Sequence, residues 1–108
     1  MMEPRVYLED FFGKIAKNED KMGGVNVKIQ YDFSGDDHGK WYVEIVDGKV
    51  MGVVEGEIEN PSCTFIAKYK NFHNAFTGKA KPAAAFMTGK IKLKGDKGIA
   101  IKLEKWSR

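Results

Sequence analysis

The chain has 108 residues, of which 43% are hydrophobic and 31% charged, and its formal net charge is +3 at neutral pH. This size and balance predict one folded domain over residues 1–108 and exclude a disordered chain. The order of helices and strands given below makes it an α+β domain. No apolar run approaches the ~20 residues that a membrane-spanning helix needs.

The first expected element is an amphipathic helix that begins at Pro4, a residue suited to a first helical turn. Apolar side chains then recur at helical spacing at Leu8, Phe11, Phe12 and Ile15. Gly13 weakens the helix by about 1 kcal/mol relative to alanine, so the helix depends on packing. The polar stretch 18–21 and the two glycines after it end the helix.

Four strands follow, because the apolar period changes from 3.6 to 2 residues. The expected strands cover residues 25–33, 41–45, 50–57 and 63–69. In the first strand polar residues such as Gln30 alternate with apolar ones, which predicts one buried and one wet face. Residues 34–39 are expected to form a solvated turn. Asp47-Gly48 is a strong hairpin signal, since both central residues of a type I′ turn need positive φ.

The C-terminal part of the chain is expected to form two short helices, a fifth strand and a last helix. Phe72 to Phe76 form the first helix, which ends at Gly78, and residues 82–87 form the second, which ends at Gly89. Ile91 and Leu93 mark the strand, and Asp96 can cap the last helix. Bulky side chains on short helices beside an alanine run are suited to surround a void, although periodicity alone favours an ordinary core.

Three stretches carry a resemblance to a known family: GKWYVEIVDGK, CTFIAKY and FTGKAKPAAAFMTGKIKLKGDKGIAIKL. The last stretch keeps the spacing of a run of glycine, lysine, proline and apolar residues without a gap. Its matching positions are Gly78, Lys79, Pro82, Ala85, Phe86, Gly89, Lys90, Ile91, Lys92, Leu93, Gly95, Gly98, Ile99, Ala100, Lys102 and Leu103. On these residues the chain resembles the sterol carrier protein-2 family of lipid-binding domains.

The resemblance implies a mostly antiparallel five-stranded sheet of order 3-2-1-4-5 that is covered on one face by helices. It also implies a hydrophobic tunnel for sterols, fatty acids or fatty acyl-CoA between sheet and helices. The tunnel wall carried onto this sequence is Phe33, Trp41, Val43, Phe72, Phe76, Phe86, Met87, Ile99, Leu103 and Trp106.

The chain departs from the family at its C-terminus. Some relatives continue past the last helix with a segment that helps to close the tunnel, whereas this sequence stops at Arg108. Two alternatives follow for closing the tunnel: Trp106 serves as a partial lid, or a second subunit of a homodimer does so.

Catalytic, metal and cofactor chemistry is not expected, and the anticipated ligand is a lipid. His38 and His73 lack companions at ligand spacing, and Cys63 reads as a small buried hydrophobic residue. A lone cysteine and an N-terminal stretch with acidic side chains, rather than the apolar segment of a signal peptide, favour a cytoplasmic location.

The lysines near residues 90–97 are interpreted as a solvated face, with acyl-CoA phosphates and anionic membrane surfaces as alternatives. Nucleic acid is not an expected partner, because Ile91 and Leu93 alternate with these lysines where a single-strand binder would have aromatic residues. The leading hypothesis is a lipid-binding or lipid-transfer domain. The alternative is a non-catalytic accessory module that presents lipophilic intermediates, for example quinone precursors, to biosynthetic enzymes, and a small enzyme is disfavoured.

Overall fold

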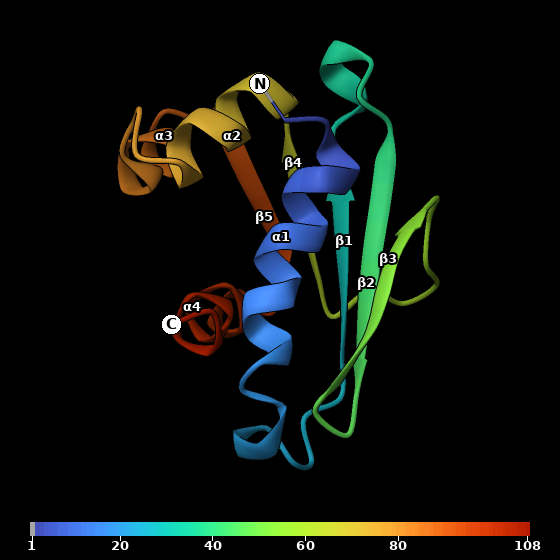
Figure 1. Cartoon of the computed structure of the whole chain (residues 1–108). Coiled ribbons are helices and arrows are strands. Elements are labelled where there is room, and N and C mark those ends of the chain that lie inside the picture. The colour runs from blue at the N-terminus through green and yellow to red at the C-terminus, as the bar shows by residue number, and fades with distance from the viewer. Residues whose placement is uncertain (1) are drawn as a thin grey trace.

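The computed structural model describes residues 2–108, which form a five-stranded sheet with four α-helices packed on it (Figure 1). The elements are α1 (Pro4–Ala16), β1 (Val27–Asp32), β2 (Lys40–Val46), β3 (Lys49–Glu55), β4 (Cys63–Ala67), α2 (Tyr69–Phe76), α3 (Pro82–Met87), β5 (Ile91–Gly95) and α4 (Lys97–Trp106). This order of helices and strands confirms the predicted order. Within residues 2–108, no helix is both long and apolar enough to cross a bilayer.

The strands lie in the order β3-β2-β1-β4-β5, as the resemblance implied. Only the β1–β4 pair is parallel, so the sheet is mostly antiparallel. The β2–β3 hairpin turns at Asp47 and Gly48, whose φ angles of 49° and 81° match the positive values that the sequence predicted. At the other end of the chain, the Asp96 side chain accepts a hydrogen bond from Gly98 N and caps α4 as expected.

The core lies between the sheet and the helices. Alternate residues of the strands, such as Ile29, Tyr31, Val43 and Ile45, point into it and are almost fully buried. Helix α1 contributes Leu8, Phe12 and Ile15 from one apolar stripe. In Figure 1, α1 crosses the sheet, while α2 with α3 and α4 lie to one side of α1 at different heights.

The predicted fourth strand is too long, because Tyr69 begins α2 instead of ending the strand. The Asp36 carboxylate causes this change: it accepts hydrogen bonds from Tyr69 N at 2.8 Å and Lys70 N at 3.1 Å, and so caps a helix from a distant loop. The His38 ring lies 5.0 Å from the Tyr69 ring. Residues 34–39 form a turn that is exposed to solvent at Ser34, Gly35 and Asp37, as predicted. In addition, the turn docks on α2 through Asp36 and His38, which the sequence did not predict.

The predicted wet face of β1 also has an exception at Gln30, which is 6% exposed. Its Nε2 donates hydrogen bonds to Trp41 O and Gly56 O, and its Oε1 accepts one from Ile58 N. The segment after β3 therefore folds over the outer face at this point. Alternation along a single strand does not reveal such a cover.

We expect the Asp36→Ala variant to lose about 1 kcal/mol of unfolding free energy at neutral pH, as for a lost helix N-cap. Burial raises the pKa of the Asp36 carboxyl, but the hydrogen bonds from Tyr69, Lys70 and His38 outweigh burial and hold this pKa below its usual value. The stabilisation is therefore present above the unfolded-state pKa of ~3.9 and is lost as the pH falls through the folded-state pKa.

Urea unfolding across a pH series checks this expectation. The unfolding free energies of the wild type and Asp36→Ala should differ at neutral pH and converge at acidic pH. The control Asp10→Ala, on an exposed face of α1, should have an unfolding free energy close to that of the wild type at every pH. A difference that persists to the acidic end of the series would contradict the assigned cap.

Candidate functional site

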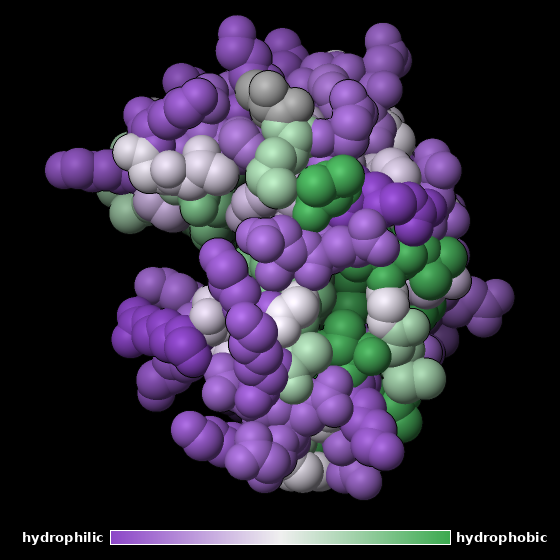
Figure 2. Space-filling view, viewed as in Figure 1, coloured by the Kyte–Doolittle hydropathy of each residue, from purple (hydrophilic) through white to green (hydrophobic). Residues whose placement is uncertain are grey.

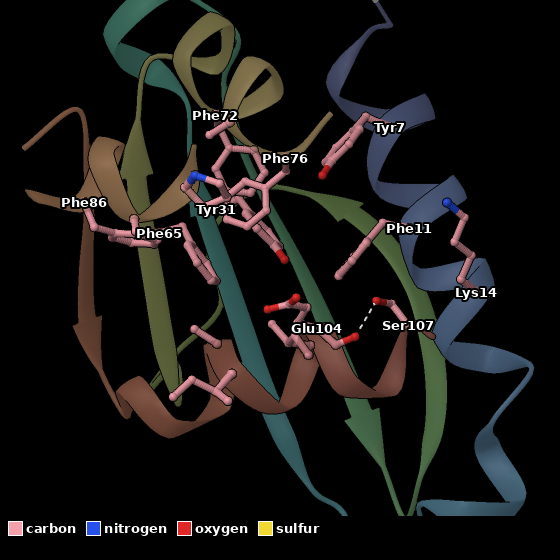
Figure 3. A pocket seen from close by; sticks show the side chains of 16 residues that line it. Tyr7, Phe11, Lys14, Tyr31, Phe65, Phe72, Phe76, Phe86, Glu104 and Ser107 are labelled. Carbon is pink, nitrogen blue, oxygen red and sulfur yellow. Dashed lines mark hydrogen bonds between the residues drawn. The ribbon is translucent and has the colours of Figure 1, made fainter. Parts of the chain in front are cut away.

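A cavity of about 490 Å³ opens between the sheet and the helices (Figure 3). Helices α1, α2, α3 and α4 all contribute to its wall, and β1 and β4 provide the side that belongs to the sheet. The lining residues are Tyr7, Phe11, Lys14, Tyr31, Phe65, Phe72, Ala75, Phe76, Pro82, Ala83, Phe86, Ala100, Ile101, Leu103, Glu104 and Ser107. Figure 2 shows the surface hollowed between the region of α3 and that of α4.

The cavity exists because small side chains stand where larger ones would fill the space. Ala75, Ala83 and Ala100 line it from three different helices. Helix α3 is only six residues long and ends before Gly89, whose φ is 77°. Bulky residues of the same helices, among them Phe76 and Phe86, line the rest of the space.

Aromatic rings form a rigid wall on the sheet side. The Tyr31 and Phe65 rings are stacked with their centroids 5.1 Å apart. Phe72 meets both of them edge to face, at 5.6 Å and 5.7 Å, and its ring lies 4.6 Å from that of Phe76. Such pairs add stability beyond the burial of their area, so the wall is preorganised.

The lining contains two charged side chains, which form ion pairs exposed to solvent, and two tyrosines, which stay uncharged. Lys14 pairs with Asp10 on α1, and Glu104 pairs with Arg108. Burial raises the pKa of the Tyr7 and Tyr31 hydroxyls well above the usual value, so both remain uncharged at physiological pH. The inner part of the cavity is therefore an apolar and neutral environment.

The structure brings together four of the ten residues predicted for the tunnel wall. Phe72, Phe76, Phe86 and Leu103 line the cavity from α2, α3 and α4. Their contact with a ligand stays a prediction.

The other six predicted residues lie elsewhere. Phe33 and Val43 are fully buried in the core, and Trp41 donates its Nε1 hydrogen to His38 O beneath the Arg5 guanidinium. Ile99 and Trp106 line a separate hollow beside residues 24–27. The structure therefore does not place Trp106 over the cavity as a lid.

Met87 is 88% exposed and points away from the cavity lining. It follows Phe86 on α3, and adjacent helical residues face directions about 100° apart. Of the two, only Phe86 lines the cavity, and a contact of Met87 with a ligand stays a prediction.

Tyr7, Phe11, Tyr31, Phe65 and Ile101 line the cavity although they were not among the predicted wall residues. The sequence does contain an indication for Tyr31 and Phe65. Alternation places both on the inner face of their strands, and the strand order implied by the resemblance makes these two strands neighbours. They are direct partners in the β1–β4 register. Phe11 belonged to the predicted apolar stripe of the first helix, but nothing in the stripe shows which of its members borders a void.

A second cavity of about 500 Å³ adjoins the first. The two share Phe86, Ala100 and Ile101 in their linings, so these side chains border both. Lys92 and Lys97 also line the second cavity. A movement of the Phe86 ring would change how far the two spaces are separated.

Two side chains of types that often act in catalysis, Cys63 and His73, are buried. Cys63 is 1% exposed, and burial raises the pKa of its thiol to about 12. His73 is buried beside Tyr7 and Tyr69, and burial lowers its pKa. In the described part of the chain, no group of three or more His, Cys, Asp and Glu side chains is placed to hold a metal ion.

The family model of the SCP-2 sterol transfer family matches residues 8–107. Among curated proteins, the chain is 39% identical over 89 residues to hydroxysteroid dehydrogenase-like protein 2 of Xenopus tropicalis, a match that covers 82% of this chain and 21% of that protein. The chain thus spans about a fifth of the length of the curated relatives it matches.

Solved structures share the fold. The sterol carrier protein domain 2 of Helicoverpa armigera matches 96% of this chain and 82% of its own, with a TM-score of 0.62 and 26% identity. A double mutant of the sec-alkyl sulfatase PisA1 matches 89% of this chain and 15% of its own, with a TM-score of 0.74 and 17% identity. The ubiquinone synthesis protein UbiJ-SCP2 matches 95% and 84%, with a TM-score of 0.63 and 13% identity.

Proposed function

This chain belongs to the SCP-2 sterol transfer family, a family of lipid-binding and lipid-transfer domains, and we propose that it holds one lipid in the cavity of about 490 Å³. The lipid classes in question are fatty acids, fatty acyl-CoA and sterol-like molecules. The observation that carries the proposal is the cavity itself, because its wall is aromatic and aliphatic and its inner part is neutral.

The size and lining of the cavity support this assignment. Small-molecule sites have volumes of roughly 300–1,000 Å³ and are mostly apolar, with a few polar groups that orient the ligand. Here the polar groups are Lys14 on α1, Glu104 on α4, Ser107 directly after α4, and the uncharged hydroxyls of Tyr7 and Tyr31. A lipid with its chain against Phe65 and Phe76 can therefore keep its polar end near these groups.

The proposal includes a non-catalytic role for this chain. Its cysteine is buried with a raised thiol pKa, which disfavours a nucleophile, and both histidines pack against tyrosine rings. A cytoplasmic location and a homodimer stay predictions.

A chain-length series tests the lipid assignment. Each buried methylene contributes ~0.8 kcal/mol, so affinity for saturated fatty acids should rise about fourfold per methylene until the cavity is filled. Beyond that length the affinity should level off. Competition with a fluorescent fatty acid measures each dissociation constant, and an affinity independent of chain length would contradict burial of the chain.

The Phe86→Ala variant sharpens this test, because Phe86 lines both cavities. Removing the ring joins them and should move the plateau to longer chains. Phe76→Ala is the matched control, since Phe76 lines the first cavity but not the second. Phe76→Ala should lower the affinity for fatty acids of every chain length by a similar factor and leave the chain length of the plateau unchanged.

A second candidate function is an accessory module that presents lipophilic intermediates to biosynthetic enzymes. The supporting observation is that the curated relatives named hydroxysteroid dehydrogenase-like protein 2 are several times longer than this domain. A ubiquinone synthesis protein also shares the fold. Transfer of lipid between vesicles by the purified protein alone favours a carrier, whereas lipid delivery only in the presence of a co-purified enzyme favours the accessory role.

A further inference from the structure

Charge is divided unevenly between the two parts of the chain. Residues 69–108, which form α2, α3, β5 and α4, contain ten Lys and Arg side chains but only two Asp and Glu side chains. Residues 1–68 contain eight basic and thirteen acidic side chains. This C-terminal part of the chain is therefore strongly basic, although the whole chain carries only a net +3.

Large apolar side chains stand exposed in the same basic part. Met87 is 88% exposed, Ile101 is 68% exposed and Phe76 is 40% exposed. Phe76 and Ile101 both line the first cavity, and Met87 directly follows Phe86, which lines both cavities. Phe76 and Ile101 therefore stand exposed at the cavity, and Met87 stands exposed next to Phe86 in sequence. Other exposed apolar side chains lie outside the basic part of the chain, at Met2, Val6, Val46, Met51 and Val54.

Exposed lysines flank these apolar groups. Lys79 and Lys81 lie in the connection between α2 and α3, and Lys90 lies between α3 and β5. Lys97 lines the second cavity together with Phe86 and Ile101. We call Phe76, Met87 and Ile101, together with Lys79, Lys81, Lys90 and Lys97, the basic rim.

We propose that the basic rim docks on the surface of a membrane that contains anionic phospholipids, with Met87 inserted among the lipids. Each lysine near such a surface strengthens binding by about fivefold through attraction to the headgroups. An exposed apolar side chain adds to binding when it enters the boundary between headgroups and acyl chains. Docking in this orientation turns the cavity opening toward the bilayer, which goes beyond the proposed function by identifying where cargo enters and leaves.

The type of basic residue favours a lipid surface over a protein partner. Nine of the ten basic side chains in residues 69–108 are lysines. Protein interfaces are depleted in lysine and enriched in arginine, whereas a lysine can extend its charge toward diffuse headgroups while its stem lies on apolar surface.

Co-sedimentation of the full chain with phosphatidylcholine vesicles, with and without phosphatidylserine, tests the proposal. The wild type should bind the vesicles with phosphatidylserine and lose binding when salt is raised. The triple variant K79E/K81E/K90E should lose at least about a hundredfold in affinity. The triple variant K17E/K21E/K49E changes the net charge equally at exposed positions in the first part of the chain, and it should lose much less.

Methionine variants test the insertion separately. Met87→Gln should weaken vesicle binding by about tenfold, while Met51→Gln, at a 61% exposed position on β3, should leave it unchanged. Met87 does not line the cavity, so Met87→Gln should bind a soluble fatty acid like the wild type. Two outcomes would overturn the docking surface. One is an equal loss of vesicle affinity in both triple variants, and the other is a vesicle affinity of Met87→Gln equal to that of the wild type. A wild type that does not bind the soluble fatty acid would instead overturn the proposed function.

Discussion

The Ala83→Phe variant is expected to bind a saturated fatty acid about thirtyfold more weakly than the wild type. Ala83 lines the cavity from α3, and a phenyl ring at this position takes the space of several methylenes. Excluding two to three methylenes costs about 2 kcal/mol, which corresponds to this loss of affinity. Isothermal titration with palmitate in detergent-free buffer measures it.

Ala84→Phe is the matched control for the blocked cavity. Ala84 is the next residue of the same helix. It is exposed, like Ala83, but it does not line either cavity. Its affinity for palmitate should stay within about twofold of the wild type, since no buried surface changes. Equal losses in both variants would show that α3 is disturbed as a whole, and an unaffected Ala83→Phe would place the ligand outside this cavity.

The Gly95→Ala variant is expected to lose roughly 3 kcal/mol of unfolding free energy, from strain and collision together. The φ angle of Gly95 is 86°, and a Cβ atom there would lie 2.5 Å from Ser62 O and 3.1 Å from Cys63 Cα. Because both atoms belong to the backbone, neither can rotate away. Urea unfolding monitored by tryptophan fluorescence measures the loss.

Gly89→Ala separates strain from collision. Its φ angle of 77° is similar, but a Cβ atom there meets nothing within 4 Å, so this variant should lose only about 1 kcal/mol. Similar losses in the two variants would contradict the assigned collision.

The position of Gly95 also matters for the cavity. Asp96 N donates a hydrogen bond to Ser62 O, which fixes the start of α4 against the start of β4. Helix α4 carries Ala100, Ile101 and Leu103 into the cavity lining. A shift of this junction therefore changes the cavity as well as the stability.

The order of elements could be predicted because each one has a local signal. The period of the apolar residues separated helix from strand, and Asp47-Gly48 and Asp96 marked a turn and a cap by chemistry that acts over a few residues. The departures at Tyr69 and Gln30 both depend on segments distant in sequence that donate or accept hydrogen bonds there. No local pattern contains such partners.

The cavity lining was less predictable, because it depends on where each helix lies over the sheet. Periodicity places Phe33 and Tyr31 on the same inner face, and Phe72 of α2 contacts both rings, but only Tyr31 borders the open space. Likewise, Phe86 and Met87 are neighbours in sequence, and only the orientation of α3 decides that Phe86 faces inward. Apolar character identified the candidate residues, and packing selected among them.

The most direct measurement of the central claim is an isotope-filtered nuclear Overhauser experiment on labelled protein with unlabelled palmitate. We expect contacts between the methylene protons of palmitate and the ring protons of Phe65, Phe76 and Phe86, which line the cavity. Contacts confined to side chains outside the cavity, such as Met51 on β3, or no contacts at all, would contradict the account.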